Sequence, residues 1–456
     1  MPSFEWIVNS KVFQKACMLF PLAIVSLSFK QFKFGMTIGI FDMVAASLAF
    51  LIVLGSCRKT FLKSKNTLLV TTVFFAIFAG TIFEFIYNSN QLVTRDFLAF
   101  SFTFILMLAW ICIPAEYSIY RNLAWSLIVY FSLILILSIL PAFLGVDVWY
   151  YGVRLQGFSD NPNQIGFLCI VAYALLLHQI LVKNIDTRLI FIANAIISLV
   201  GYLSGSTAFT ISAIIGAILI MLHIVYLKWS YKNDASNRIR NIIAFVAPML
   251  IIFFVILSNS IVKNVDWQNI DPPKWNEIFG TSDAPPPAVD TSTDKPSTTV
   301  KESIIPNWID SDGKPSVELR EFVEENVDDS TKQGSVRLSI WLRVLKKSLE
   351  KPVLGHGFGT LVAIEDYPHP TEAHNTVLDF ALISGLLGVG AVGVLMILVT
   401  FQAYRNQHLF FAVFILGTLG SYAMFHFLGR QPLFWILIFL MPAIPILTPS
   451  TSRLAH

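Results

Sequence analysis

Charged side chains are scarce in this chain of 456 residues, of which only 13 % are Asp, Glu, Lys or Arg. Soluble globular domains carry about 25 %, so the composition excludes an ordinary soluble enzyme. The net charge of +3 is too small for the dense basic face of a nucleic-acid-binding protein, and no nucleic acid partner is expected. Cysteine is scarce too. The four cysteines are scattered without CxxC spacing, which favours small core residues over a metal or redox site.

Apolar residues, by contrast, make up 55 % of the chain, and its mean hydropathy is +0.67. About 20 mostly apolar residues are needed to cross a bilayer. The chain therefore predicts an all-α polytopic membrane protein with about twelve transmembrane helices, near residues 12–28, 36–55, 67–87, 96–113, 123–143, 163–182, 187–202, 205–226, 241–258, 376–399, 408–428 and 431–447.

Basic residues predict how these spans are oriented, because short cytoplasmic loops carry an excess of Lys and Arg. With the N-terminus inside, the cytoplasmic segments hold fifteen Lys and Arg, whereas the short outer loops hold five. Both termini are therefore predicted to lie in the cytoplasm.

One long outer loop interrupts the series of spans. Residues 1–258 are predicted to hold the first nine spans, 259–375 to form the loop, and 376–456 to hold the last three spans and a cytoplasmic tail. Fifteen of the 29 acidic residues lie in the loop before residue 336, together with many Pro, Ser and Thr. Such composition favours a flexible segment, and we expect 280–300 to be a spacer.

The end of the loop has a different pattern. Apolar residues recur at helical spacing among basic ones over about 336–351, and Pro352 follows. This predicts an amphipathic helix that lies on the outer surface of the membrane and ends before the proline.

Ionisable residues within the spans are costly and mark function or a specific partner. Here they gather toward the predicted outer face, namely Asp42, Glu84, Asp379 and His426 near outer helix ends, and Arg154, Arg430, His369 and His374 in or beside outer loops. A transporter or flippase usually has such groups near the membrane midplane, so the distribution favours chemistry at the outer face. Taken singly, Asp42 or Glu84 is more typical of a carboxylate that snorkels or bonds between helices than of a functional group.

The first outer segment of interest runs from Arg154 to Asn163. Its Asn161-Pro162-Asn163 sequence predicts the start of a helix. A helix N-terminus with an arginine nearby favours phosphate, but capping alone would also explain the pattern, and both interpretations stay open.

The second segment runs from Pro352 to Gly388. Glu372 and His374 precede the tenth span, and a histidine there can take a proton from a hydroxyl while a carboxylate orients it. The spacing from His369 to His374 is not the HExxH zinc pattern, so no metal and no cofactor is expected. We interpret Gly385 and the glycines that follow it as sites of close helix packing.

This region contains three motifs, SVRLSIW at Ser335–Trp341, PVLGHG at Pro352–Gly357 and AHNTVLDFALISGLL at Ala373–Leu387. Together they resemble the O-antigen ligase and O-antigen polymerase-like family of bacterial inner-membrane glycosyltransferases. The number of spans and the GFxxNPNQ sequence ending at Gln164 also match, so the resemblance covers about residues 154–390.

The resemblance implies a GT-C-like membrane fold and a metal-independent transfer. The donor would be a glycan on undecaprenyl diphosphate, and a sugar hydroxyl of the acceptor would attack its anomeric carbon at the periplasmic face. By motif, Arg337 matches the loop arginine that contacts the diphosphate, and His374 matches the histidine that acts as base or orients the acceptor. Glu372 and Asn163 are expected to support them.

One stretch departs from the family pattern. Many members carry an arginine where this chain has Ser204–Ala208, which contains none. The second cation for the diphosphate is therefore expected from Arg154 or Arg430. For Arg430, a role as an anchor at the membrane surface is an equal alternative.

These features predict an O-antigen ligase-like transferase in the bacterial inner membrane, with lipid A-core as the acceptor. A polymerase of O-antigen or exopolysaccharide that acts on a glycan acceptor is the alternative on the same fold. A polysaccharide transporter or flippase is less favoured.

Overall fold

The computed structural model describes residues 11–29, 33–34, 38–56, 65–87, 91–114, 117–144, 150–151, 154–159, 161–182, 185–230, 236–263, 330–363 and 371–442. The chain forms two compact units, one made of Met1–Val255 with Ser339–His456 and the other of Ile256–Leu338. The spacer predicted at 280–300 and His369 lie outside the described residues.

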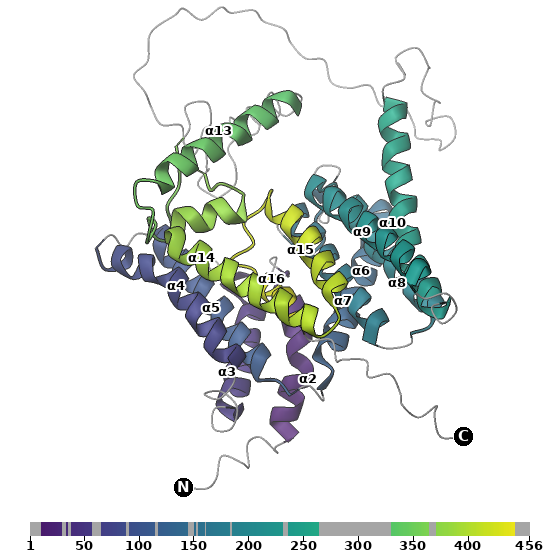
Figure 1. The fold of residues 1–456 in the computed structure, drawn as a ribbon, viewed down its shortest axis with the longest axis horizontal. Helices are drawn as coiled ribbons and strands as arrows, with labels where there is room; N and C mark the ends of the chain where they lie inside the picture. The colour runs from purple at the N-terminus through teal and green to yellow at the C-terminus, as the bar shows by residue number, and fades with distance from the viewer. Residues whose placement is uncertain are drawn as a thin grey trace, which may run out of the picture. The chain divides into compact units, whose positions relative to one another are not determined.

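Helices dominate the described part of the chain. They are α2 (Lys11–Ser26), α3 (Ile40–Ser56), α4 (Lys65–Tyr87), α5 (Gln91–Cys112), α6 (Ile119–Leu144), α7 (Pro162–Val182), α8 (Thr187–Leu203), α9 (Thr207–Ser230), α10 (Ser236–Lys263), α13 (Ser330–Ser348), α14 (Thr376–Arg405), α15 (Leu409–Ala423) and α16 (Pro432–Leu440) (Figure 1).

Each predicted span coincides with one of these helices, but their lengths differ. Within the described residues, five helices are long and apolar enough to cross a membrane, in α5, α6, α7, α9 and α14. A polytopic, mostly helical membrane protein is thus confirmed. Twelve crossings, the GT-C-like arrangement and the position of both termini stay predictions.

Two short hairpins depart from the all-α expectation. Lys33–Phe34 (β1) pairs with Ile38–Gly39 (β2), and Tyr150–Tyr151 (β3) pairs with Arg154–Leu155 (β4), both antiparallel. Each strand has two residues, and each hairpin joins the end of one helix to the start of the next.

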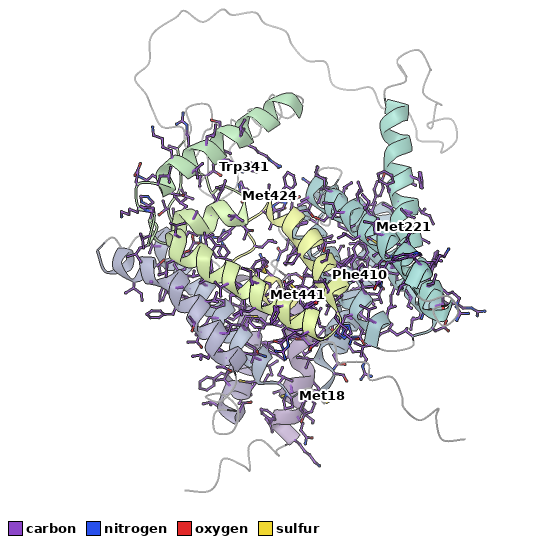
Figure 2. All side chains as sticks on the ribbon, in the orientation of Figure 1. Met18, Met221, Trp341, Phe410, Met424 and Met441 are labelled. Carbon is purple, nitrogen blue, oxygen red and sulfur yellow. The ribbon has the colours of Figure 1, made fainter. Side chains whose placement is uncertain are left out.

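The first unit is built around α7, because 89 % of its apolar window is buried within the protein. Helix α7 packs against α6, α8, α9, α15 and α16, while α4 packs along α14 (Figure 1). The outer helices expose large apolar side chains such as Phe75 (68 %), Leu222 (62 %) and Ile397 (68 %). Met18 and Met221 are likewise exposed, whereas Met441 is buried (Figure 2). Soluble proteins rarely expose so much apolar surface, which fits contact with lipid.

Helix α14 is broken at Gly385, whose φ of +58° and ψ of −157° are not helical. The break leaves carbonyl and N–H groups of the flanking turns without partners inside the helix. The PVLGHG segment supplies the missing partners. His356 N and Gly357 N donate to the carbonyls of Leu382 (2.7 Å) and Ile383 (2.9 Å), and the N–H groups of Leu386 and Leu387 donate to Pro352 O (2.7 Å) and Val353 O (3.1 Å).

This break corrects our interpretation of the glycines of α14. A Cβ on Gly385 would lie 2.5 Å from Val353 O, whereas a Cβ on Gly390 or Gly393 would meet no atom of the described residues within 4 Å. Gly385 is therefore required for the break and for the approach of PVLGHG. Gly390 and Gly393 do not serve close helix packing.

The predicted amphipathic helix corresponds to α13, which ends at Ser348, close to the expected end at 351. Ile340 and Val344 are buried, whereas Leu342, Leu345 and Leu349 are 58, 46 and 67 % exposed. A stripe of exposed leucines beside basic residues fits a helix at a membrane surface.

Candidate active site

His374 lies in a short turn that leads into α14. Its side chain is exposed, and its φ of +50° is a left-handed conformation that few residues other than glycine adopt. Asn375 caps α14, because its Oδ1 accepts the N–H groups of Val377 (3.1 Å) and Leu378 (3.2 Å). The turn therefore presents His374 just before the first residue of the helix.

The carboxylate of Asp379 fixes this turn from within. Its Oδ1 accepts the N–H of Ala373 (2.8 Å) and its Oδ2 accepts the N–H of Asn375 (3.1 Å), so both neighbours of His374 are held by one side chain. Asp379 is only 2 % exposed. On the other side, Trp341 of α13 donates its Nε1–H to the carbonyl of Ala373 (3.1 Å). The backbone around His374 is thus held by contacts from two helices.

Glu372, two residues before His374, belongs to an ion-pair network. Both of its carboxylate oxygens lie 2.7 Å from Nη2 of Arg430. Nη1 of Arg430 lies 2.8 Å from Oδ1 of Asp96 on α5, and Arg95 pairs with the same oxygen at 2.8 Å. The network joins two guanidinium groups and two carboxylates, so its charges balance.

The charge on Arg430 is strongly stabilised in this setting. Burial alone would lower its pKa, but the carboxylates of Glu372 and Asp96 outweigh burial, and the pKa of Arg430 is raised above its ordinary value. Thr103 also donates its hydroxyl to the carbonyl of Arg430 (2.8 Å). Arg430 therefore holds Glu372 in place as a permanent cation.

Arg154 lies in a second polar cluster. Its Nη2 donates to Oδ1 of Asn163 at the start of α7 (2.7 Å), and its Nε donates to the carbonyl of Ser204 (3.0 Å). Its aliphatic part lies against Gly205, where an added Cβ would be 3.1 Å from Cγ of Arg154. Both acceptors are neutral, and no ion pair among the described residues includes Arg154. Its positive charge is therefore not offset by a carboxylate there.

The chain between α15 and α16 connects the two clusters. Tyr422 donates its hydroxyl to the carbonyl of Asn163, and its ring lies 4.9 Å from that of His426. The carbonyl of His426 in turn accepts the hydroxyl of Thr376 at the start of α14 (2.6 Å). Both clusters consequently lie at the same end of the helices of this unit.

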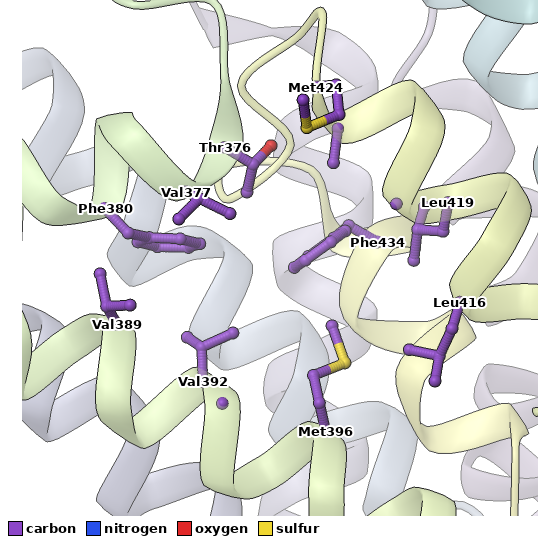
Figure 3. A pocket seen from close by; sticks show the side chains of 13 residues that line it. Thr376, Val377, Phe380, Val389, Val392, Met396, Leu416, Leu419, Met424 and Phe434 are labelled. Carbon is purple, nitrogen blue, oxygen red and sulfur yellow. The ribbon is translucent and has the colours of Figure 1, made fainter. Parts of the chain in front are cut away.

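An apolar cavity of about 260 Å³ adjoins the turn (Figure 3). It is lined by residues of α14, α15 and α16, among them Phe380, Met396 and Leu416. Thr376 and Met424 form the wall nearest the turn (Figure 3), and the carbonyl of Met424 accepts the side-chain N–H of Asn375 (3.4 Å). The polar site and an apolar space therefore share a boundary.

The structure brings together most of the residues singled out in the sequence. Glu372 and Arg430 form an ion pair next to His374, and Arg154 binds Asn163. Arg337 is exposed on α13 and belongs to the second unit, so its pairing with His374 stays a prediction. In the described part of the chain, no group of three or more His, Cys, Asp or Glu side chains is placed to hold a metal ion.

Asp96 and Asp379 were not assigned to the site from the sequence. The sequence indicated only that Asp379 lies near the outer end of its span. That its carboxylate accepts two backbone N–H groups depends on the conformation of the turn before it. For Asp96 a signal existed, because the adjacent Arg95 and Asp96 open an apolar run where ionisable residues are rare.

Residues 192–393 match the family model described as O-Antigen ligase. Over these residues the chain is similar to the O-antigen ligase family, and the match supports an O-antigen ligase-like family for it. The match runs from α8 to α14 and includes Arg337, Glu372 and His374, while Arg154 and Arg430 lie outside it. No curated protein matches the chain.

The match supports an activity like that of an O-antigen ligase or polymerase, and it suggests the lipid bilayer and glycans as the surroundings and substrates. The resemblance seen in the sequence is thereby confirmed at the level of the family.

Proposed function

We propose that the protein transfers a glycan from undecaprenyl diphosphate to a sugar hydroxyl of lipid A-core, at the periplasmic face of the bacterial inner membrane and without a metal ion. The observation that carries this proposal is the exposed His374 in a turn fixed by Asp379, within the segment that matches the O-antigen ligase family. A base must be held in position to work efficiently.

In the proposed reaction, His374 takes the proton of the acceptor hydroxyl as its oxygen attacks the anomeric carbon of the donor sugar. The bond between that carbon and the phosphate oxygen breaks, and its electron pair leaves with undecaprenyl diphosphate. Glu372, held by Arg430, orients His374 or the acceptor. A new glycosidic bond and the free lipid diphosphate are the products.

The leaving diphosphate gains negative charge and needs cations nearby. We assign this role to Arg337 and Arg154. Arg154 contacts Ser204 and Gly205, the stretch in which many relatives carry an arginine, and no described carboxylate offsets its charge. Arg430 fits the role less well, because the carboxylates of Glu372 and Asp96 already offset its charge.

The apolar cavity beside the turn supports a lipid-linked donor, since hydrocarbon is stable in such a space. A polymerase that extends a lipid-linked glycan would use the same donor and the same groups. It is the second candidate, because only the acceptor differs. The clustering of polar groups at one helix end argues against a transporter or flippase.

The test uses a host strain without the gene, complemented with wild type or with His374→Ala, Arg337→Ala or Arg154→Ala, and a gel of its surface lipopolysaccharide. We expect each variant to be inserted but to lose transfer almost completely. The matched controls are His223→Ala for the histidine, Lys346→Ala as another cation on the helix of Arg337, and Arg188→Ala for Arg154, and all three should transfer normally.

Bare core in the deletion strain, with long glycan left on its lipid carrier, indicates a ligase. Core carrying one repeat unit indicates a polymerase. Near wild-type banding in a variant would refute the role of that residue, and unchanged banding in the deletion strain would refute lipopolysaccharide as the product.

A further inference from the structure

A second cavity, of about 450 Å³, lies at the opposite ends of the helices that carry the candidate active site. Helices α5, α7 and α14 have Asp96, Asn163 and the turn of His374 at or near their first residues. Their last turns line this cavity, together with the beginnings of α4 and α6 and the end of α16. The proposed transfer reaction uses none of its residues, which include Asn66, Arg121, His178, Gln179 and Gln402.

His178 lines this cavity with a buried side chain. It is only 5 % exposed, and Nε2 of Gln179 lies 3.1 Å from its Nδ1. Because an amide nitrogen only donates, Nδ1 of His178 accepts, and the ring hydrogen is on Nε2. That Nε2 has no hydrogen-bond partner among the described residues. A buried donor without a partner is costly, so the site is suited to a ligand with an acceptor oxygen.

Arg121 supplies a positive charge. It is exposed in the first turn of α6 and forms no ion pair with a described residue, and no Asp or Glu is among the described residues that line the cavity. Among the described residues, the wall of the cavity thus combines one cation, two N–H donors without a hydrogen-bond partner (Nε2 of His178 and Nε1 of Trp110) and several side-chain amides. This set complements an anion of single charge with several oxygen atoms.

We propose that the cavity binds a phosphate group, carried by the phosphodiester head of an anionic membrane lipid. A phosphodiester has one negative charge, which matches the single guanidinium of Arg121. The apolar part of the wall, with Ile111, Val182 and Phe439, suits the adjoining hydrocarbon. A phosphate-bearing solute shares the chemistry of the head group but not the need for this apolar wall.

The test measures thermal unfolding of the full-length protein in nanodiscs of phosphatidylcholine with increasing phosphatidylglycerol. Phosphatidylglycerol should raise the Tm of the wild type in a saturable way. Arg121→Gln and His178→Leu should each need about tenfold more lipid for half of this effect, since each loses a direct contact to phosphate. Lys228→Gln is the matched control, because it removes an exposed cation at the same helix ends outside the cavity, and it should respond like the wild type.

Inorganic phosphate distinguishes the two sources. If it competes with phosphatidylglycerol and raises the Tm by itself, the cavity binds phosphate from a solute, and the lipid part of the proposal is wrong. If phosphatidylglycerol acts alone, the lipid is the ligand. An equal response of Arg121→Gln and the wild type, or no response to either compound, would show a cavity that holds only water. Should His178→Leu fail to fold, Arg121→Gln decides the question alone.

Discussion

At the scale of single residues, the presentation of His374 depends on hydrogen bonds to its two neighbours. Asp379 accepts both, and each distance is within the normal range for a hydrogen bond. A carboxylate accepts hydrogen bonds on both of its oxygens at once. The amide of an asparagine has an NH2 group in place of one oxygen, and this donor would face a backbone N–H.

Asp379→Asn should therefore lower the rate of glycan transfer at least tenfold while reducing the free energy of unfolding by about 1–3 kcal/mol. Transfer is measured in membranes and unfolding in detergent. Asp42→Asn is the matched control, because Asp42 also accepts a backbone N–H, that of Gly39 at 2.8 Å, on a different helix. Wild-type transfer by Asp379→Asn would contradict the role given to its carboxylate.

The sequence was informative about residues that act through their own chemistry. His374, Glu372 and Arg154 were recognised because a histidine, a carboxylate or an arginine beside an apolar span has few structural uses. The partners of Arg430 could not be recognised in the sequence, because Asp96 and Glu372 are far apart in the chain and meet only through tertiary packing. Likewise, nothing local indicates that Arg154 contacts Gly205.

At the scale of elements, the break in α14 decides how the glycine-rich span is built. Period and hydropathy predict one continuous helix from Thr376, because both depend only on residues within it. The break instead depends on backbone groups of PVLGHG, which lie outside the span. An element whose geometry is completed by another segment cannot be recognised from its own pattern.

Gly385→Ala should destabilise the protein by about 1–3 kcal/mol or more, because alanine at φ +58° is strained and its Cβ would meet Val353 O. Gly390→Ala, in the same helix but facing open space, should be neutral or slightly stabilising, since alanine favours helix by about 1 kcal/mol over glycine. Thermal unfolding of the two variants in detergent gives the comparison. Equal melting temperatures would argue against a strained position at Gly385.

At the scale of the whole molecule, the order of the helices could be predicted from the length that a bilayer requires of a span. The length rule for spans placed the apolar runs, and helices occupy the same stretches of the chain. The rule does not predict packing, so the buried position of α7 and the pairing of α4 with α14 emerged only in three dimensions. It also says nothing about hairpins such as Tyr150–Tyr151 with Arg154–Leu155.

Removal of half of 280–300 should leave both insertion and glycan transfer within twofold of the wild type. The stretch is polar, rich in Pro, Ser and Thr, and contains none of the residues proposed to act in transfer. Complementation of the deletion strain measures the effect on the lipopolysaccharide gel. Lost transfer by a protein that is still inserted would mean that this stretch binds the acceptor.

The hydrogen bonds between PVLGHG and the broken α14 have a consequence for chimaeras with related enzymes. Residues 352–357 and 382–387 exchange backbone hydrogen bonds in both directions, so neither segment is complete without the other. A donor loop that replaces the end of 259–375 but brings its own version of PVLGHG should fit only together with its own first half of α14. The natural junction for such a graft therefore lies beyond Leu387, well inside a helix, and not at the visible border between loop and span.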